Sequence, residues 1–169
     1  ADVLTALGHC ERMTSALTDS AAHCSEAASR YAALNVPHGE AVARTQWGIA
    51  LVQLGDLPGG LAQLERSRDL SHALGDAQKE SDALIDIGIV HNMLGDDARA
   101  IQLYQQALPV YEAHGDRYHA ATCLNNMAYA HVCWGERHLP ERPDEARGTL
   151  PGRQHWLRKR CHWPAPAIH

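Results

Sequence analysis

The fold is decided by residues 77–116, which read AQKESDALIDIGIVHNMLGDDARAIQLYQQALPVYEAHGD. When the chain is shifted by 40 residues, Leu94-Gly95-Asp96 falls on Leu54-Gly55-Asp56 and on Trp134-Gly135-Glu136. A fixed period between about 20 and 50 residues is typical of repeat proteins, in which similar units stack side by side. The period therefore predicts an array of units rather than one globular domain.

The period divides the chain into copies and an unlike end. The same shift aligns Leu7-Gly8 with Trp47-Gly48, so a weaker copy is expected at the start. We expect copies at residues 1–36, 37–76 and 77–116 and a half copy at 117–136, which together form a repeat domain over residues 1–136. Residues 137–169 hold 7 of the 15 Lys and Arg residues and break the period, so they predict an irregular basic C-terminal extension.

Each copy predicts two helices joined by a tight turn. In residues 77–94 and 97–114, apolar side chains recur at helical spacing. They are Ala83, Leu84, Ile87, Val90 and Leu94 in the first helix, and Ala100, Ile101, Tyr104, Ala107, Leu108 and Tyr111 in the second. Gly-Asp pairs follow the helices, with glycine expected as a left-handed C-cap and aspartate as the next N-cap. Pro58 falls in a first turn, where proline is tolerated, whereas Pro109 falls inside a helix and is expected to kink it.

Two glycines, Gly48 and Gly88, fall in the middle of predicted helices, where each costs roughly 1 kcal/mol relative to alanine. We expect them to allow a close approach of the paired helix, since Ala128 at the equivalent place is also small. One large core position recurs in the second helices and is occupied by Cys24, Leu64 and Tyr104.

The pattern Leu84-x-x-Ile87-Gly88-x-x-His91, followed by Gly95, Ala100, Tyr104 and Ala107, resembles the tetratricopeptide repeat in its longer variant. The resemblance implies an all-α fold, a right-handed superhelical solenoid of antiparallel helix pairs. The residues that it implies as structural are Gly48, Gly55, Gly88, Gly95, Ala100, Tyr104, Ala107, Gly115 and Asn126. The chain departs from the family pattern at five positions. Arg44 stands where later copies have Leu84 and Leu124, and the usual aromatic residue is replaced by Glu11, Leu51, His91 and His131.

In this family the first helix of each pair lines the concave side, so the resemblance implies a groove that binds a protein or peptide. The implied partner-binding residues are Thr45, Ile49 and Gln53, then Asp82, Ile85, Ile89, Asn92 and Met93, then Thr122, Asn125, Tyr129 and Cys133. Any single Ile or Val can instead be a packing residue between repeats. Asn92, Asn125 and Tyr129 are the better candidates, because a polar residue on the inner face has less packing reason to be there.

Two further groups of positions bear on the groove. No Lys or Arg occupies the equivalent inner positions in the second to fourth copies, which disfavours recognition of a partner's acidic C-terminal tail. Gln46, Asp86 and Asn126 share one repeat position, and this position favours hydrogen bonds between adjacent repeats over ligand contact.

Composition argues against several classes of protein. No apolar run reaches the roughly 18 residues that a membrane-spanning helix needs, and no secretory signal is visible. A net charge of −5 argues against nucleic-acid binding. Five cysteines with no CxxC pair argue against a disulfide framework and favour a cytoplasmic protein. Because no catalytic, phosphate-binding or metal-ligand motif is found, we expect no enzyme activity, no cofactor and no metal site.

The 12 histidines leave a metal or redox sensor as a minor alternative. His91 and His131 lie one repeat apart on equivalent faces, so stacking could bring them within reach of each other. The competing interpretation is that both replace a core aromatic residue. Cys24 and Cys123 fall at core positions, where cysteine behaves as a small hydrophobic residue.

The sequence thus predicts a protein-interaction scaffold, and the resemblance implies the regulatory part of a larger bacterial signalling or transcription protein. A self-association module is the alternative, because an array cut in mid-repeat exposes an unpaired apolar helix that a second copy could cover. For residues 137–169, which include Trp156 and Trp163, three interpretations stay open: a cap on the last helix, a basic and aromatic docking segment, and an out-of-register end.

Overall fold

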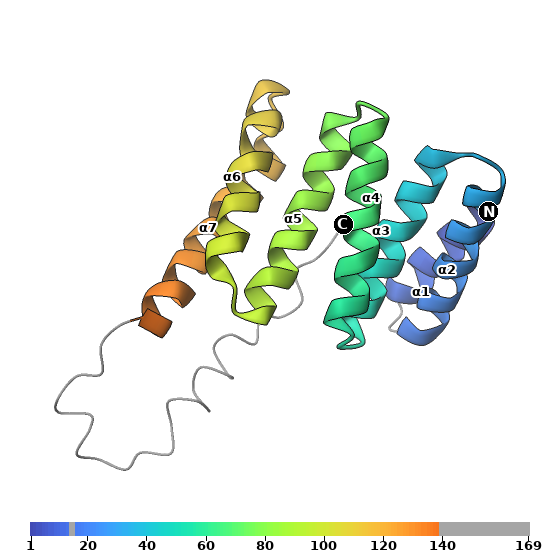
Figure 1. The fold of residues 1–169 in the computed structure, drawn as a ribbon, viewed down its shortest axis with the longest axis horizontal. Coiled ribbons are helices and arrows are strands. Elements are labelled where there is room, and N and C mark those ends of the chain that lie inside the picture. The colour runs from blue at the N-terminus through green and yellow to red at the C-terminus, as the bar shows by residue number, and fades with distance from the viewer. Residues whose placement is uncertain (14–15, 139–169) are drawn as a thin grey trace, which may run out of the picture.

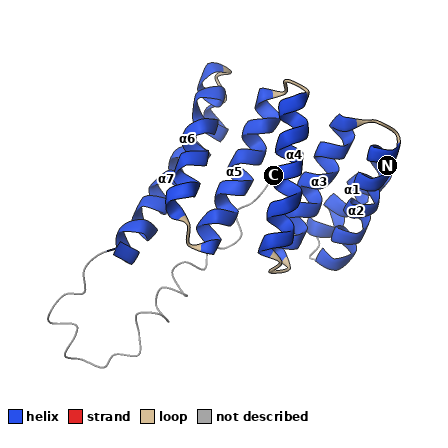
Figure 2. Cartoon of the chain, in the orientation of Figure 1, coloured by secondary structure: helices blue, strands red, loops and turns tan. Residues whose placement is uncertain are grey.

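Seven helices make up the part of the chain that this computed structural model describes, residues 1–13 and 16–138, and those residues contain no strand (Figures 1 and 2). The helices are α1 (Asp2–Met13), α2 (Leu17–Ala33), α3 (Pro37–Gln53), α4 (Leu57–Ala73), α5 (Ala77–Leu94), α6 (Asp97–Ala113) and α7 (Arg117–His138). The prediction of an all-α solenoid of helix pairs is confirmed. The expectations for the C-terminal extension lie, from residue 139 onward, outside the described residues.

The turns between the helices recur every 20 residues. In the five turns from α2 to α7, one residue has a positive φ, which ranges from 54° at Asn35 to 90° at Gly55; the set is Asn35, Gly55, Gly75, Gly95 and Gly115. The next residue is the N-cap of the following helix, and where it is aspartate its carboxylate accepts a backbone N–H three residues on, as Asp96 does from Arg99 at 3.1 Å. The predicted glycine C-caps and aspartate N-caps are therefore confirmed. Ala16 and Val36, at the same place earlier in the chain, make no side-chain capping bond.

The curvature of the array follows from which helices touch. Each helix packs against its neighbours in sequence, and α1 also contacts α3, α3 contacts α5, and α5 contacts α7. Within the described residues, by contrast, α2 does not contact α4 and α4 does not contact α6. The first helices of successive pairs are therefore closer together than the second helices. We call α1, α3, α5 and α7 the inner layer, and α2, α4 and α6 the outer layer.

Glycines at one repeat position let the two helices of a pair approach closely. A Cβ atom built on Gly88 would lie 2.5 Å from Cε1 of Tyr104, well inside van der Waals contact. The same relationship recurs one repeat apart, between Gly8 and Cys24, between Gly48 and Leu64, and between Gly88 and Tyr104. The packing reason predicted for the mid-helix glycines is confirmed, and the recurrence at Gly8 extends the same close approach to α1 and α2.

The core follows the period as well. Cys24, Leu64 and Tyr104 are all buried, as predicted. Leu94 is an exception, because it is 50% exposed although its spacing places it on the apolar stripe. It directly precedes the turn residue Gly95, where the chain leaves the neighbouring helix. The residues before the other turns, among them Leu54 and Leu74, are exposed for the same reason.

Two sequence features that depart from an ideal repeat are accommodated locally. Arg44, which replaces the leucine of later copies, donates to Oε1 of Glu40 at 2.7 Å and to Oε1 of Gln63 at 2.6 Å. Pro58 lies in the first turn of α4 as predicted, and α6 continues through Pro109 to Ala113. Neither feature interrupts the stacking of pairs.

Candidate functional site: the inner layer

The structure places every predicted partner-binding residue on an inner-layer helix. Those with side chains exposed or half-buried are Thr45, Gln53, Asp82, Ile89, Asn92, Met93, Thr122, Asn125 and Tyr129. Ile49, Ile85 and Cys133 are buried, at 2%, 6% and 5% exposure. These three therefore contribute mainly packing, whereas the other nine offer surface to a partner.

Asn92 links the groove surface to the core. Its Nδ2 donates to the hydroxyl of Tyr104 at 3.0 Å, while its Oδ1 is buried and has no hydrogen-bond partner among the described residues. Burial raises the pKa of the Tyr104 hydroxyl, so Tyr104 stays neutral and accepts this bond. Next to Asn92, the side chain of Met93 is 55% exposed, and Asn125 on α7 is also exposed. The α5–α7 part of the inner layer thus presents mixed polar and apolar surface.

The repeat position shared by Gln46, Asp86 and Asn126 has a different role in each copy. Oε1 of Gln46 accepts from Nε of Arg12 at 3.3 Å and lies 3.2 Å from Nδ1 of His9, so Gln46 joins two repeats as predicted. Asn126 is 8% exposed, and its Nδ2 has no partner among the described residues. Asp86 likewise makes no hydrogen bond within the part of the chain that is described.

Arg12 is an inner-layer residue that the sequence reasoning missed. It is only 7% exposed, and besides Gln46 it contacts Nδ1 of His9 at 3.2 Å through Nη2. Burial lowers the pKa of its guanidinium, and Asp86 counteracts this. The sequence could have indicated this position, because the 40-residue shift aligns Arg12 with Val52 and with the predicted groove residue Asn92. The prediction of a groove without basic residues concerned only the second to fourth copies, and Arg12 lies in the first.

Two carboxylates of α5, those of Asp82 and Asp86, differ in how their hydrogen-bonding capacity is satisfied. Asp82 accepts from the Tyr111 hydroxyl at 2.7 Å and from Nζ of Lys79 at 3.0 Å. Asp86 has no such donors, and desolvation together with the nearby Asp82 raises the pKa of its carboxyl to about 7, against the opposing effect of Arg12. The titratable groups that act on Asp86 or line the cavity beside it are Arg12, His38, Lys79, Asp82, Tyr104 and Tyr111.

A cavity of about 120 Å³ opens between α3 and α5, with α4 behind it. Its polar lining includes Thr45, Gln46, Ser67, Ser71, Asp82 and Asp86. Thr45 and Ser67 are engaged with each other, because their hydroxyl oxygens are 2.8 Å apart. Of the predicted groove residues, only Thr45, Ile49 and Asp82 line this cavity.

The histidines and cysteines do not converge on a metal site in the described residues. No group of three or more His, Cys, Asp or Glu side chains there is placed to hold an ion. His91 is half-buried with Nδ1 3.6 Å from Oδ2 of Asp96, whereas His131 is exposed, so the interpretation of His131 as a core residue is wrong. The predicted burial of Cys24 and Cys123 is confirmed, and burial raises the pKa of the Cys123 thiol to about 11.

None of the seven described helices combines the length and the apolar character needed to cross a lipid bilayer.

Residues 40–113 match the family model of the tetratricopeptide repeat. No curated protein matches the chain significantly. Among solved structures, the chain is similar to BtubC (BKLC) from P. vanneervenii, with a TM-score of 0.60 and 15% sequence identity. That match covers 83% of this chain and 66% of the other, so the chain spans just under two thirds of that protein, and at this identity the likeness concerns the fold alone.

Proposed function

We propose that this chain, whose residues 40–113 belong to the tetratricopeptide repeat family, is a protein-interaction scaffold that binds a peptide segment along its inner layer. The observation that carries the proposal is the surface of α5 and α7. Met93 and Asn125 are exposed there beside the half-buried Ile89 and Asn92, which gives apolar contacts and hydrogen-bonding groups on adjacent helices. Such a mixed surface suits an extended or helical peptide.

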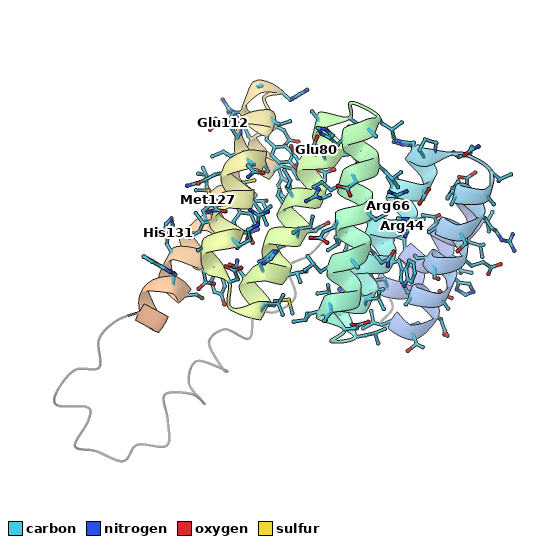
Figure 3. The ribbon with its side chains drawn as sticks, in the orientation of Figure 1. Arg44, Arg66, Glu80, Glu112, Met127 and His131 are labelled. Carbon is cyan, nitrogen blue, oxygen red and sulfur yellow. The ribbon has the colours of Figure 1, made fainter. Side chains whose placement is uncertain are left out.

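A display selection with random peptides on the full chain, followed by calorimetry on the selected peptides, tests this function. We expect Asn125→Ala and Met93→Asp to weaken binding at least tenfold. Matched controls are Arg66→Ala on α4 and Glu112→Ala on α6, two exposed outer-layer residues (Figure 3). Equal affinity in inner-layer and outer-layer variants, or no selected peptide at all, would contradict the proposal.

We further propose that the scaffold is the cytoplasmic regulatory part of a larger bacterial signalling or transcription protein. The family resemblance supports this. Reading the coding sequence beyond residue 136 in all three frames tests it. A continued repeat or an output domain in any frame supports the proposal, and a reading without either in all frames removes it.

Self-association is a second candidate function, favoured by one observation on α7. Leu124 is 52% exposed, although its equivalent Leu84 in the preceding copy is 7% exposed. A second copy of the chain could cover this side chain in place of a further helix. Light scattering over a range of concentrations tests the idea, with Leu124→Lys as the variant. A dimer that Leu124→Lys dissociates is expected, and a monomer at every concentration overturns it.

A further inference from the structure

The cavity between α3 and α5 exists because the second copy lacks a side chain that its neighbours have. In the first and third copies, a tyrosine near the end of the outer helix donates its hydroxyl to an aspartate near the start of the inner helix of the same pair. The pairs are Tyr31 with Asp2 and Tyr111 with Asp82. At the corresponding positions of the second copy stand Ser71 and Val42, and both line the cavity.

The replacement leaves space rather than a rearranged core. Tyr31 and Tyr111 are 7% and 0% exposed, so each fills its own place in the array. Ser71 is as deeply buried, at 2% exposure, and it lines the cavity. The space of about 120 Å³ in front of it is comparable to cavities that bind small planar molecules.

The charges around the space select the kind of group that fits. Both oxygens of Asp82 already accept bonds, from Tyr111 and Lys79. The guanidinium of Arg12 is directed to Gln46 and His9 rather than bonded to Asp86. Asp86 therefore remains a half-buried carboxylate without a donor at the edge of the cavity. A planar group with several N–H donors would supply the donors that Asp86 lacks and could also donate to the hydroxyl of Ser71.

We propose that this cavity accepts the guanidinium of an arginine side chain from a bound peptide, with Asp86 as its carboxylate partner and Ser71 as a hydroxyl acceptor. The proposal rests on the proposed peptide-binding function and names the feature of the peptide that this part of the groove reads. Arginine fits better than lysine, because its planar fork can bond the carboxylate with two N–H groups and still offer others to the hydroxyl.

The test uses the full chain and two small probes, Nα-acetyl-arginine methylamide and the matching citrulline compound. Citrulline has nearly the same shape as arginine but no charge. Amide chemical shifts in NMR titrations report binding and its position. We expect arginine to bind about tenfold or more tightly than citrulline, with shifts centred on Ser71 and Asp86. Equal affinity of the two probes overturns the proposal.

Two variants test whether the arginine probe binds in this cavity. Asp86→Asn keeps the shape but removes the charge, so it should abolish the preference for arginine over citrulline. The double variant Val42→Asp with Ser71→Tyr recreates the tyrosine–aspartate pair of the third copy and fills the cavity. It should fold, melt at a higher temperature and lose arginine binding. If this filled variant, with its raised melting temperature, still binds arginine as the wild type does, the site is not this cavity.

The same variants separate this inference from the broader function. If selected peptides bind the wild type and the filled variant equally and need no arginine, the groove binds peptides and the arginine cavity is wrong. If no peptide binds while the arginine probe still shifts Ser71 and Asp86, the cavity is right and peptide binding along the groove is wrong. Both proposals are supported if a selected peptide contains arginine and binds more weakly to Asp86→Asn and to the filled variant than to the wild type.

Discussion

The ring of Tyr104 occupies the place where a side chain at Gly88 would have to stand, with only 2.5 Å between its Cε1 and a Cβ built on that glycine. The pair sits at the crossing of α5 and α6, and Tyr104 is fully buried there. A buried ring cannot move aside without disturbing its other neighbours, because protein interiors are close-packed.

Gly88→Ala should therefore destabilise the fold by about 1–3 kcal/mol, because overpacking outweighs the roughly 1 kcal/mol that alanine gains in helix propensity. Urea denaturation followed by circular dichroism gives the free energy of unfolding. Gly135→Ala on α7 is the control, since nothing lies within 4 Å of a Cβ there. Its unfolding free energy should stay the same or rise. Equal effects of the two substitutions would show that close approach at Gly88 is unimportant.

The missing cap at the start of α3 should be repairable. Val36 occupies the N-cap position at which later turns have aspartate, and it makes no capping bond. We expect Val36→Asp to raise the free energy of unfolding by about 0.5–1 kcal/mol, and Asp96→Ala to lower it by about 1 kcal/mol. Both are measured by urea denaturation. A loss of stability in Val36→Asp would contradict the assignment of position 36 as an equivalent cap.

The left-handed turn at Asn35 offers a second stabilising change. Asn35 has a φ of 54°, whereas the other four positions of the series are glycine. Glycine adopts this conformation without the steric cost that a Cβ brings, so Asn35→Gly should raise the melting temperature slightly, by about 1–3 °C. Gly75→Asn tests the reverse direction and should lower it. Differential scanning calorimetry measures both. A lower melting temperature for Asn35→Gly together with a higher one for Gly75→Asn would contradict the turn geometry.

The stability of the fold should depend on pH through Asp86. Its carboxyl has a pKa of about 7 in the folded chain, against roughly 3.9 in an unfolded chain. Between these values the folded state holds more protons than the unfolded state, so the free energy of unfolding falls as pH rises from about 4 to about 7. Asp86→Asn removes this loss. We expect the variant to gain about 1–3 kcal/mol on the wild type between pH ~5 and pH ~8.

Urea denaturation at the two pH values measures this gain, and Asp69→Asn, at an exposed carboxylate of α4, is the control. The control should change little relative to the wild type at either pH. A gap between Asp86→Asn and the wild type that stays constant with pH would mean that Asp86 is ionised normally in the folded protein.

Most of the fold could be predicted from the 40-residue period of the sequence. Glycine and aspartate at the turns, and the pairing of Gly48 with Leu64, follow from short-range rules on caps and helix crossing. The exposure of Leu94 did not follow, because spacing alone does not show where a helix parts from its neighbour. His131 was misjudged for a related reason, because equivalence with the half-buried His91 by spacing alone does not show which neighbours cover the side chain.

The groove was harder to predict than the fold. The inner-layer helices were identified, but the depth of each residue depends on the curvature, and Ile49 and Ile85 proved to be buried. The cavity has no motif of its own. It results from Ser71 standing where neighbouring copies have tyrosine. The sequence alone does not show that the tyrosine hydroxyl bonds to an aspartate of the paired helix, as Tyr111 bonds to Asp82.

The turns at every twentieth residue also bear on how the molecule can grow. Inner and outer helices begin and end at the same phase of a 20-residue unit, from Asn35 to Gly115. One 40-residue segment therefore starts and stops with the same backbone geometry, whichever copy supplies it. Gene duplication can add such a segment without a new linker, and each added copy brings its own choice of tyrosine or serine at the position of Ser71. Each copy can therefore carry a filled or an open cavity at this position, independently of the other copies.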